Sequence, residues 1–315
     1  MENSVIVSKL SSRHGGIPAG FSLHFPEEYR FGKNAVTAHR NFLAQTGVDF
    51  LKVMNESRVT VPAYIVDPED WSYINPFDRN TGFVRQQLDI IKALADTLGD
   101  SVPLIATIHG VFASAFHACR VSEDRFSRGN PVDAHLRLNS AVTLAGMRAI
   151  AEGLTDFALA CLDAGAAGIY YAALGGEEER FSAEEFEAWI KPLDLQVLRA
   201  VQERAGFVIL HICKNQVRLP LYADYPAAII NWAIHESNPD LAAGAELFRD
   251  RIILGGLDDR DGVLVHGTQE EIAARVTALV SQMREHYFIL GADCTLPTDI
   301  DLKRIQWAVE AAHKS

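Results

Sequence analysis

The length, composition and charge of the chain set the first limits on its class. The chain has 315 residues, of which 48% are hydrophobic and 22% charged, which suits one large globular domain or at most two. The formal net charge of −12 argues against nucleic acid or an anionic membrane surface as the main partner. We find no segment of signal-peptide type and no run long enough to span a bilayer, and therefore expect a cytoplasmic protein.

Eight apolar runs of strand length recur along the chain and alternate with segments of helical periodicity. The expected strands are Phe21–Phe25, Phe50–Met54, Leu104–His109, Gly168–Ala173, Val208–Cys213, Ala228–Trp232, Ile252–Gly255 and Phe288–Ala292. The expected helices include Phe83–Leu98, Leu144–Cys161, Ala183–Ala205 and Glu270–Glu285. Ser182 and Glu185 have the spacing of a capping box at the start of the third of these helices.

Eight strands that alternate with helices predict an α/β fold, a (β/α)8 TIM barrel. A doubly wound open sheet is the alternative, and the lack of a glycine-rich dinucleotide motif after the first strand weighs against it. We expect residues 18–315 to form a single barrel domain, preceded by a flexible N-terminal segment at residues 1–17. Residues 110–140 are expected to form a long insertion after the third strand.

Soft metal ligands stand at the ends of two expected strands. Side chains two positions apart in a strand point the same way, so His211 and Cys213 face one side together. If the strand that ends at Cys294 lies beside that one, a His-Cys-Cys set forms whose ligand types suit zinc, with a fourth position open for catalysis. The other two cysteines, Cys119 and Cys161, are expected to be buried and reduced.

Barrel enzymes place their sites at the carboxyl ends of the strands, and further polar residues fall there. These are His24, Asn55, Glu56, His109, Tyr170, Tyr171, Asn231 and Asp258. A zinc ion at such a site would hold a thiol substrate as the nucleophilic thiolate. A water-activating hydrolase is the alternative, but that chemistry more often uses histidines and carboxylates, and two cysteines reduce the Lewis acidity of the metal.

Several motifs of the chain resemble the uroporphyrinogen decarboxylase superfamily. They are Tyr170–Gly176, Arg180–Phe186, Ile209–Cys213, Asn231–Trp232, Leu254–Asp258 and Leu290–Pro297. The resemblance covers nearly the whole chain and implies a (β/α)8 barrel with one of two activities. One branch decarboxylates uroporphyrinogen without a cofactor, and the other moves methyl groups between a corrinoid protein and a small molecule. In the second branch a His-x-Cys pair and a distant cysteine hold zinc, and His211, Cys213 and Cys294 fall on those positions.

Two departures from the family pattern bear on the substrate. The decarboxylase branch has an N-terminal arginine-rich element that binds carboxylates, whereas Gly16–Glu28 contains no arginine, so decarboxylation is not expected. Similar methyltransferases usually have glycine directly after the cysteine of the pair, where this chain has Lys214. Lys214 is either a solvated residue at the rim or a partner for an acidic group of the substrate.

The resemblance also implies roles for other residues. Glu56 stands where the decarboxylase branch has a functional aspartate, and is an acid–base group, a further zinc ligand or a solvated loop residue. His109 and Tyr171 are the other catalytic candidates. The candidate substrate-binding residues are Asn55, Lys214, Asn231 and Asp258.

We therefore expect a zinc-dependent methyltransferase that uses methylcobalamin or another corrinoid. The corrinoid is expected on a partner protein, because the chain has no Asp-x-His-x-x-Gly cobalamin motif. The small molecule is a thiol acceptor such as coenzyme M or, in the other direction, an O-methyl donor such as a methoxylated aromatic. The alternatives are a cofactor-free decarboxylase and a non-catalytic barrel that binds metal or thiol. Barrels of this kind can form oligomers.

Overall fold

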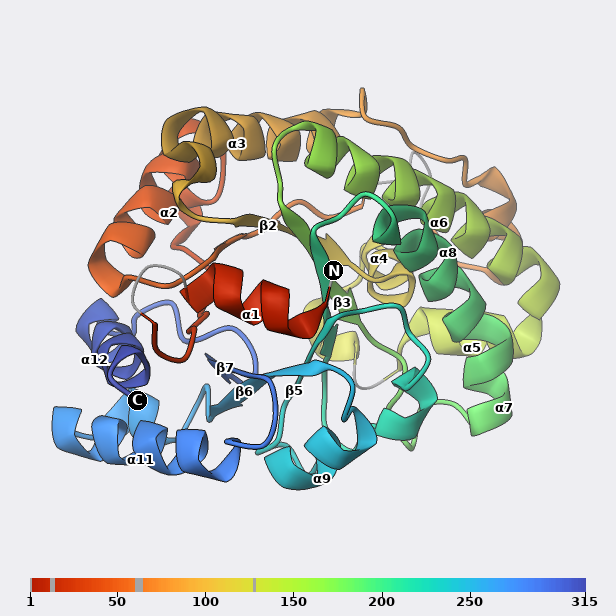
Figure 1. The fold of residues 1–315 in the computed structure, drawn as a ribbon. Coiled ribbons are helices and arrows are strands. Elements are labelled where there is room, and N and C mark those ends of the chain that lie inside the picture. Colours follow the sequence, from red (N-terminus) through yellow and green to blue (C-terminus); the bar gives the residue numbers. More distant parts are fainter. Residues whose placement is uncertain (1, 12–14, 60–64, 127–128) are drawn as a thin grey trace.

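The computed structural model describes residues 2–11, 15–59, 65–126 and 129–315, and its strands form one parallel sheet (Figure 1). The strands are hydrogen-bonded in chain order from β1 to β7. They are β1 (Leu51–Val53), β2 (Leu104–His109), β3 (Gly168–Ala173), β4 (Phe207–Ile212), β5 (Ile229–Trp232), β6 (Ile252–Leu257) and β7 (Phe288–Ala292). Seven of the eight expected strands are therefore confirmed.

The expected first strand, Phe21–Phe25, is the exception. In its place, an extended segment makes two isolated parallel bridges, Ala19 to Leu290 and Leu23 to Leu296. Two backbone hydrogen bonds accompany these bridges, from the Gly20 N–H to the Leu290 carbonyl at 2.9 Å and from the Leu290 N–H to the Pro18 carbonyl at 2.8 Å. The segment takes the eighth position next to β7, so the α/β barrel class is confirmed and the eighth strand is corrected to two bridges.

Helices connect the strands and cover the outside of the sheet. They are α1 (Asn3–Ser11), α2 (Gly32–Thr46), α3 (Gly82–Leu98), α4 (Val111–Ala118), α5 (Pro131–Leu138), α6 (Ser140–Asp163), α7 (Ala183–Glu185), α8 (Lys191–Gln202), α9 (Leu241–Leu247), α10 (Val263–His266), α11 (Gln269–Gln282) and α12 (Leu302–His313). The described helices include none that is long and apolar enough to cross a membrane.

One expected helix is divided in the structure. The capping box of Ser182 and Glu185 starts α7 as predicted. Residues Phe186–Ile190 then form a π-helical turn, and α8 follows with Pro192 in its first turn. Proline has no N–H for an intrahelical hydrogen bond, which explains why Ala183–Ala205 does not form one regular helix.

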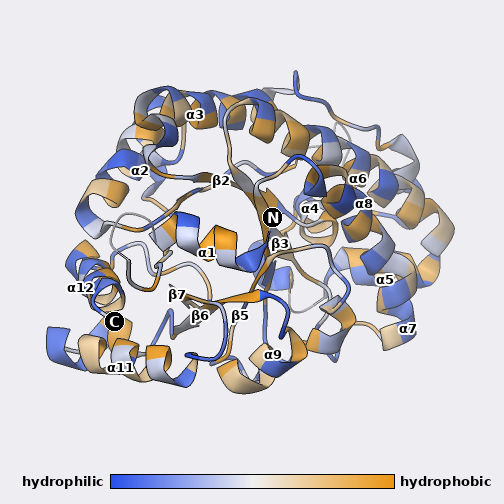
Figure 2. Cartoon of the chain, viewed as in Figure 1, coloured by the Kyte–Doolittle hydropathy of each residue, from blue (hydrophilic) through white to orange (hydrophobic). Residues whose placement is uncertain are grey.

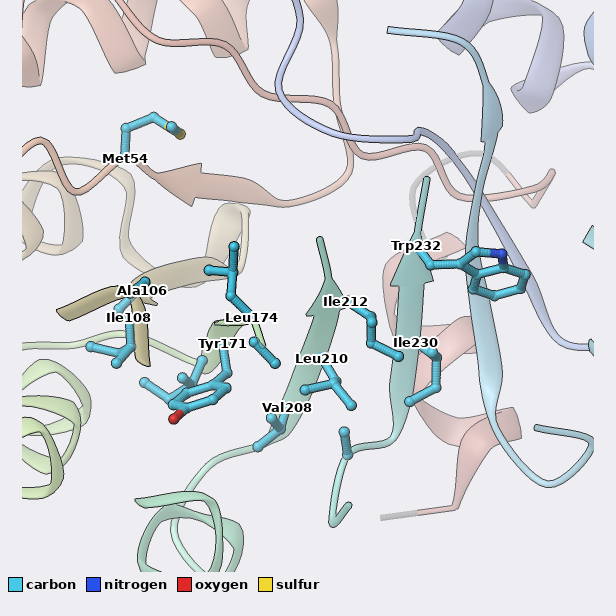
Figure 3. Packing of buried hydrophobic residues seen from close by; sticks show 14 of the residues in the cluster. Met54, Ala106, Ile108, Tyr171, Leu174, Val208, Leu210, Ile212, Ile230 and Trp232 are labelled. Carbon is cyan, nitrogen blue, oxygen red and sulfur yellow. The ribbon is translucent and has the colours of Figure 1, made fainter. Parts of the chain in front are cut away.

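Side chains of the strands alternate between the surrounding helices and the interior of the barrel. Outward residues such as Ile108, Leu210 and Ile230 belong to the main hydrophobic core (Figure 3). Inward residues such as Ile209 and Ile289 form a second, smaller cluster. The outer helices carry both hydrophobic and hydrophilic residues, as expected for elements with one face on the core and one on solvent (Figure 2).

Helix α1 closes the end of the barrel at which the strands begin. It crosses the centre of the ring of strands and helices (Figure 1), and Ile6 and Leu10 join the inward-facing cluster, each 2% exposed. The segment at residues 1–17, expected to be flexible, thus contains a helix at Asn3–Ser11; residues 1 and 12–14 lie outside the described part, and the expected domain division stays a prediction. Two apolar residues four positions apart give a short helix one buried face, even where the segment as a whole is polar.

The packing of α1 leads to a stability prediction. Leu10→Ala should lower the free energy of unfolding by about 2–4 kcal/mol, because it removes buried methyl groups and leaves a void. Val5→Ala on the same helix is the control, since Val5 is 48% exposed, and should change stability by less than about 0.5 kcal/mol. Urea unfolding followed by circular dichroism measures both. Equal effects of the two substitutions would contradict the packing of α1 against the barrel.

Candidate metal centre

The predicted ligands His211, Cys213 and Cys294 meet at the carboxyl end of the barrel. One ligand atom from each lies within 4.8 Å of the others, and His211 Nε2 is 3.5 Å from Cys294 Sγ. The sequence argument assumed that the strand before Cys294 lies beside the one with His211. In fact β5 and β6 separate β4 from β7, so the side chains approach across the interior of the barrel.

Asn231 determines which nitrogen of His211 faces the sulfurs. Its amide nitrogen donates to the carbonyls of Leu254 and Ala292, at 2.9 Å and 3.1 Å. These bonds direct the side-chain oxygen towards His211 Nδ1, at 2.6 Å, and Nδ1 must therefore carry the proton. Nε2 keeps its lone pair and faces Cys294, as a metal ligand requires.

Tyr170 and Lys52 complete the surroundings of the ligands. The Tyr170 ring stacks on the His211 ring with centroids 5.5 Å apart, and its hydroxyl donates to Asn231 at 3.2 Å. Lys52 Nζ lies 3.7 Å from the centroid of the Tyr170 ring. Sequence reasoning missed Lys52, although a lysine inside the apolar run Phe50–Met54 was an available signal, because lysine is rarely buried in a strand.

The two clustered cysteines differ in acidity. A hydrogen bond from the Cys213 thiol holds the pKa of Cys294 well below its usual value. The same bond, together with burial, raises the pKa of Cys213. Cys119 and Cys161 are buried elsewhere as expected, and burial raises the pKa of Cys119 to about 12 and that of Cys161 further. Only the clustered pair therefore has a thiolate available near neutral pH.

The ligand cluster forms part of the wall of a cavity of about 410 Å³. Predicted site residues line the same cavity, namely His24, Asn55, Glu56, His109 and Lys214. Lys214 has φ +87°, a left-handed conformation that glycine adopts most easily. Its Nζ lies 5.0 Å from the centroid of the Phe126 ring, so the side chain covers part of the cavity.

Glu56 belongs to the cavity but not to the ligand cluster. Its carboxylate lies 2.8 Å from His24 Nδ1 and 4.0 Å from Arg30 Nε, and its side chain is 10% exposed. These partners fix the position of Glu56 on the wall, and the side-chain oxygen of Asn55 beside it accepts the backbone N–H of Ser57 at 3.0 Å. Glu56 is therefore placed where it can act as an acid–base group, whereas the contact of Asn55 stabilises the local loop.

His109 and His117 form another part of the cavity wall. Their rings meet edge to face with centroids 5.3 Å apart. Burial lowers the pKa of His109 to about 3, with the neighbouring His117 adding to the effect. His109 is therefore a neutral imidazole at neutral pH, suited to a hydrogen bond rather than to carrying charge.

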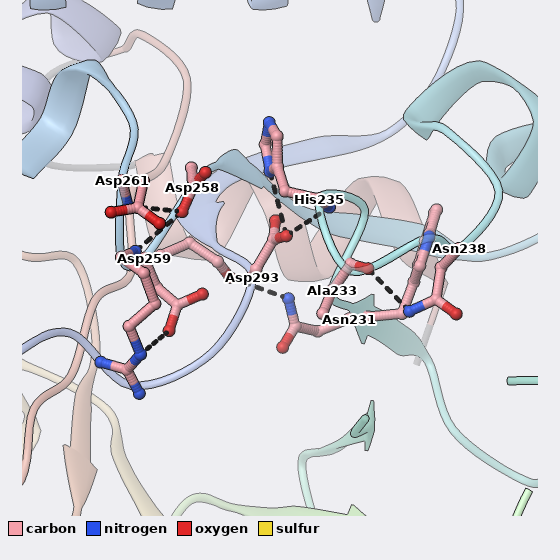
Figure 4. A network of polar contacts seen from close by, with 12 residues as sticks. Asn231, Ala233, His235, Asn238, Asp258, Asp259, Asp261 and Asp293 are labelled. Atoms are coloured by element: carbon pink, nitrogen blue, oxygen red, sulfur yellow. Dashed lines mark hydrogen bonds and ion pairs between the residues drawn. The ribbon is translucent and has the colours of Figure 1, made fainter. Parts of the chain in front are cut away.

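The structure does not bring Tyr171 or Asp258 to the cavity. Tyr171 faces the helices, since Tyr170 next to it faces inward, and its hydroxyl donates to Asp194 at 2.5 Å (Figure 3). Asp258 accepts the N–H groups of Arg260 and Asp261, at 2.7 Å and 3.1 Å, and shapes the loop after β6 (Figure 4). The side-chain alternation thus turns Tyr171 away from the barrel interior, whereas Asp258 lies at the carboxyl end of β6 but outside the cavity wall. The roles expected for the two residues stay predictions.

The fold and the site define an α/β barrel protein with a His-Cys-Cys cluster at the carboxyl ends of its strands. Residues 42–315 match the family model described as uroporphyrinogen decarboxylase (URO-D), and the chain belongs to that family.

Two curated relatives are named methylcobamide:CoM methyltransferase MtbA, from Methanosarcina acetivorans and Methanosarcina mazei. Each is 26% identical over 65% of this chain, and the match spans 57% of the relative's own length. A solved methyltransferase from Methanosarcina mazei has the same fold, with TM-score 0.74 and 14% identity over 99% of this chain and 98% of its own. A B12-independent methionine synthase from Shewanella sp. W3-18-1 follows with TM-score 0.62 and 13% identity over 95% and 97%.

The contacts of Asn231 predict an effect on metal binding. Asn231→Ala removes the acceptor for His211 Nδ1–H, so the ring loses its fixed tautomer and orientation. We expect the affinity for a divalent ion to fall about 10–100-fold, measured by competition with a chromogenic chelator. The same substitution at Asn238, which bonds only backbone carbonyls and an N–H, is the control. An unchanged affinity in Asn231→Ala would contradict this role.

The neutral state of His109 predicts a pH dependence. In the unfolded chain a histidine has a pKa of about 6.5, whereas burial lowers the pKa of His109 to about 3 in the fold. Between these values the unfolded state binds the extra proton, so stability is full above about pH 6.5 and falls as the pH decreases. His109→Gln should lessen this fall between about pH 6.5 and 4 in urea unfolding. The same change at exposed His266 controls for the loss of a histidine, and identical pH profiles would contradict the prediction.

Proposed function

We propose that this protein transfers a methyl group between a corrinoid on a partner protein and a small thiol, with zinc held by His211, Cys213 and Cys294. The observation that carries this proposal is the convergence of one imidazole nitrogen and two sulfurs on a cavity wall. Three protein ligands leave one position for a substrate, as in catalytic zinc sites.

The ligand atoms suit zinc in type and in spacing. Tetrahedral ligands at usual Zn–S and Zn–N bond lengths lie about 3.6 Å apart, and His211 Nε2 lies 3.5 Å from Cys294 Sγ. Metal binding needs an unprotonated imidazole nitrogen and deprotonated sulfurs. Asn231 provides the first by its bond to Nδ1, and the lowered pKa of Cys294 provides one of the two thiolates.

Zinc, when bound, supplies one kind of chemistry here: it keeps a thiol substrate in the nucleophilic thiolate form at neutral pH. The protein residues do the rest. Asn231 orients His211, and the buried walls of the cavity exclude water from the reacting sulfur. In the transfer, that sulfur forms a bond to the methyl carbon while the carbon–cobalt bond breaks, and the electron pair of the broken bond stays on cobalt.

Three observations support this reaction. The relatives are named methylcobamide:CoM methyltransferase, a name that gives a methylcobamide and CoM as the two partners of the methyl transfer. The cavity opens at the carboxyl ends of the strands, where a corrinoid protein can approach. Tyr29 and Phe31, which are 41% and 46% exposed, flank the cavity residue Arg30 and give the rim apolar contacts for such a partner.

The decarboxylase alternative has less support in the cavity. A substrate with many carboxylates requires cations that are free to bind it. Arg30 lies 4.0 Å from Glu56, and Arg58 lies 2.9 Å from Glu123, so both arginines of the wall face carboxylates of the protein. Among the described residues of the wall this leaves two lysines, Lys52 and Lys214, for a substrate with many carboxylates. The reverse methyl transfer, from a methoxylated donor to the reduced corrinoid, would use the same cavity. The two assays described next distinguish it from transfer to a thiol.

The test is a spectroscopic assay of methyl transfer. Zinc-loaded protein is mixed with methylcobalamin and a panel of thiols, and demethylation is followed by absorbance; the reverse assay uses cob(I)alamin and methoxylated aromatics. We expect thiol-dependent demethylation, and we expect Cys213→Ala to lose both bound zinc and activity. Cys119→Ala is the matched control, since Cys119 lies outside the cluster, and should retain its zinc. Absence of transfer in both assays with zinc-loaded wild-type protein would overturn the proposal, and activity in the reverse assay alone would replace the thiol by an O-methyl donor.

A further inference from the structure

Lys52 is a buried lysine whose position the fold alone does not explain. It lies in the middle of β1, only 7% exposed, with its side chain inside the barrel. It lines the main cavity together with the ligand cluster. A second cavity of about 20 Å³ lies in the barrel interior, and both Lys52 and Cys294 line that one too. Lys52 and Cys294 therefore line both cavities together.

No carboxylate of the described residues forms an ion pair with Lys52. The ammonium is held over the Tyr170 ring at 3.7 Å instead. The arginines of the cavity differ, since Arg30 and Arg58 both face glutamates. Burial lowers the pKa of Lys52 to about 8, and the nearby sulfurs of Cys294 and Cys213, followed by Glu56, oppose that shift and favour the charged form. The charge of Lys52 is thus directed at the ligand cluster and available to a substrate beside it.

The net charge of the zinc-loaded site with a bound thiolate explains why a cation is needed at this position. A divalent ion with two cysteine thiolates is neutral, so a substrate that adds a third thiolate leaves one net negative charge in a buried place. Such a charge is costly unless a cation stands close by. After methylation the sulfur belongs to a neutral thioether, and the attraction to a cation is lost.

We propose that Lys52 is the residue that makes the cavity specific for a negatively charged sulfur, so that it favours the thiolate substrate over the thioether product. This inference rests on the proposed function and adds a residue to it. Lys52 acts as a specificity-determining residue through its charge, without binding the metal. It also accounts for product release, because methyl transfer removes the charge that Lys52 attracts.

The experiment compares ligand binding by Lys52 variants loaded with zinc. Calorimetry measures the affinity of each protein for 2-mercaptoethanol, which binds as a thiolate, and for dimethyl sulfide, a neutral thioether. Lys52→Met keeps a similar volume without the charge and should bind the thiol about tenfold more weakly, with the thioether unchanged. Lys52→Arg should retain most of the thiol affinity. Lys303→Met, which removes an exposed lysine on α12, should match the wild type.

Stability separates this role from a merely structural one. A lysine that only supports the fold would leave Lys52→Met less stable, whereas removal of a buried charge without an ion-pair partner should leave the metal-free protein at least as stable in urea unfolding. Equal thiol affinity of wild type and Lys52→Met, or equal losses for thiol and thioether, would overturn the proposal. So would wild-type zinc protein that binds no thiol. If thiol binding depends on Lys52 but the protein does not demethylate methylcobalamin, the role of Lys52 stands and the proposed reaction is wrong.

Discussion

The hydrogen bond between His211 and Asn231 is the contact on which the His211, Cys213 and Cys294 cluster depends. Asn231 is itself fixed by the carbonyls of Leu254 and Ala292, so one side chain on β5 connects β4 with β6 and β7. The orientation of the imidazole is therefore set by the sheet rather than by a loop. Residues on strands hold their positions more closely than residues on loops, which is what a site for an ion requires.

Around the cavity, several residues depart from the pattern of apolar strands and ordinary backbone conformations that holds in the rest of the chain. The strands are mostly apolar, yet β1 contains the buried Lys52 and β2 ends at the half-buried, neutral His109. Lys214 adopts a backbone conformation that favours glycine. Each of these features costs stability in isolation, and their concentration around one cavity is typical of a functional site.

Local patterns were sufficient for much of the fold. Apolar runs located β2, β3 and β7 with their observed bounds, because strands buried on both faces are continuous stretches of apolar residues. The family resemblance agreed with the matched family model. Helix α1 was missed, since its contribution to the core comes from Ile6 and Leu10 alone, and two residues in a polar segment give little periodic signal.

Side-chain direction was harder to predict than strand position. Tyr170 and Tyr171 are equivalent in a sequence of apolar residues, but only the first faces the interior, and the second bonds Asp194 among the helices. The phase of the alternation depends on which face of the sheet becomes the inside of the barrel. Nothing within the run Gly168–Ala173 specifies that choice, because both faces are buried.

The sequence by itself determined seven of the strands, the family and the pairing of His211 with Cys213, since these rest on patterns that can be read along the chain. Only the tertiary structure decided that Cys294 completes the cluster across the barrel, that Asn231 orients the histidine, and that Lys52 stands beside the sulfurs. The reason is physical: these contacts join segments that are far apart in the sequence, and the pairing and curvature of the sheet bring them together.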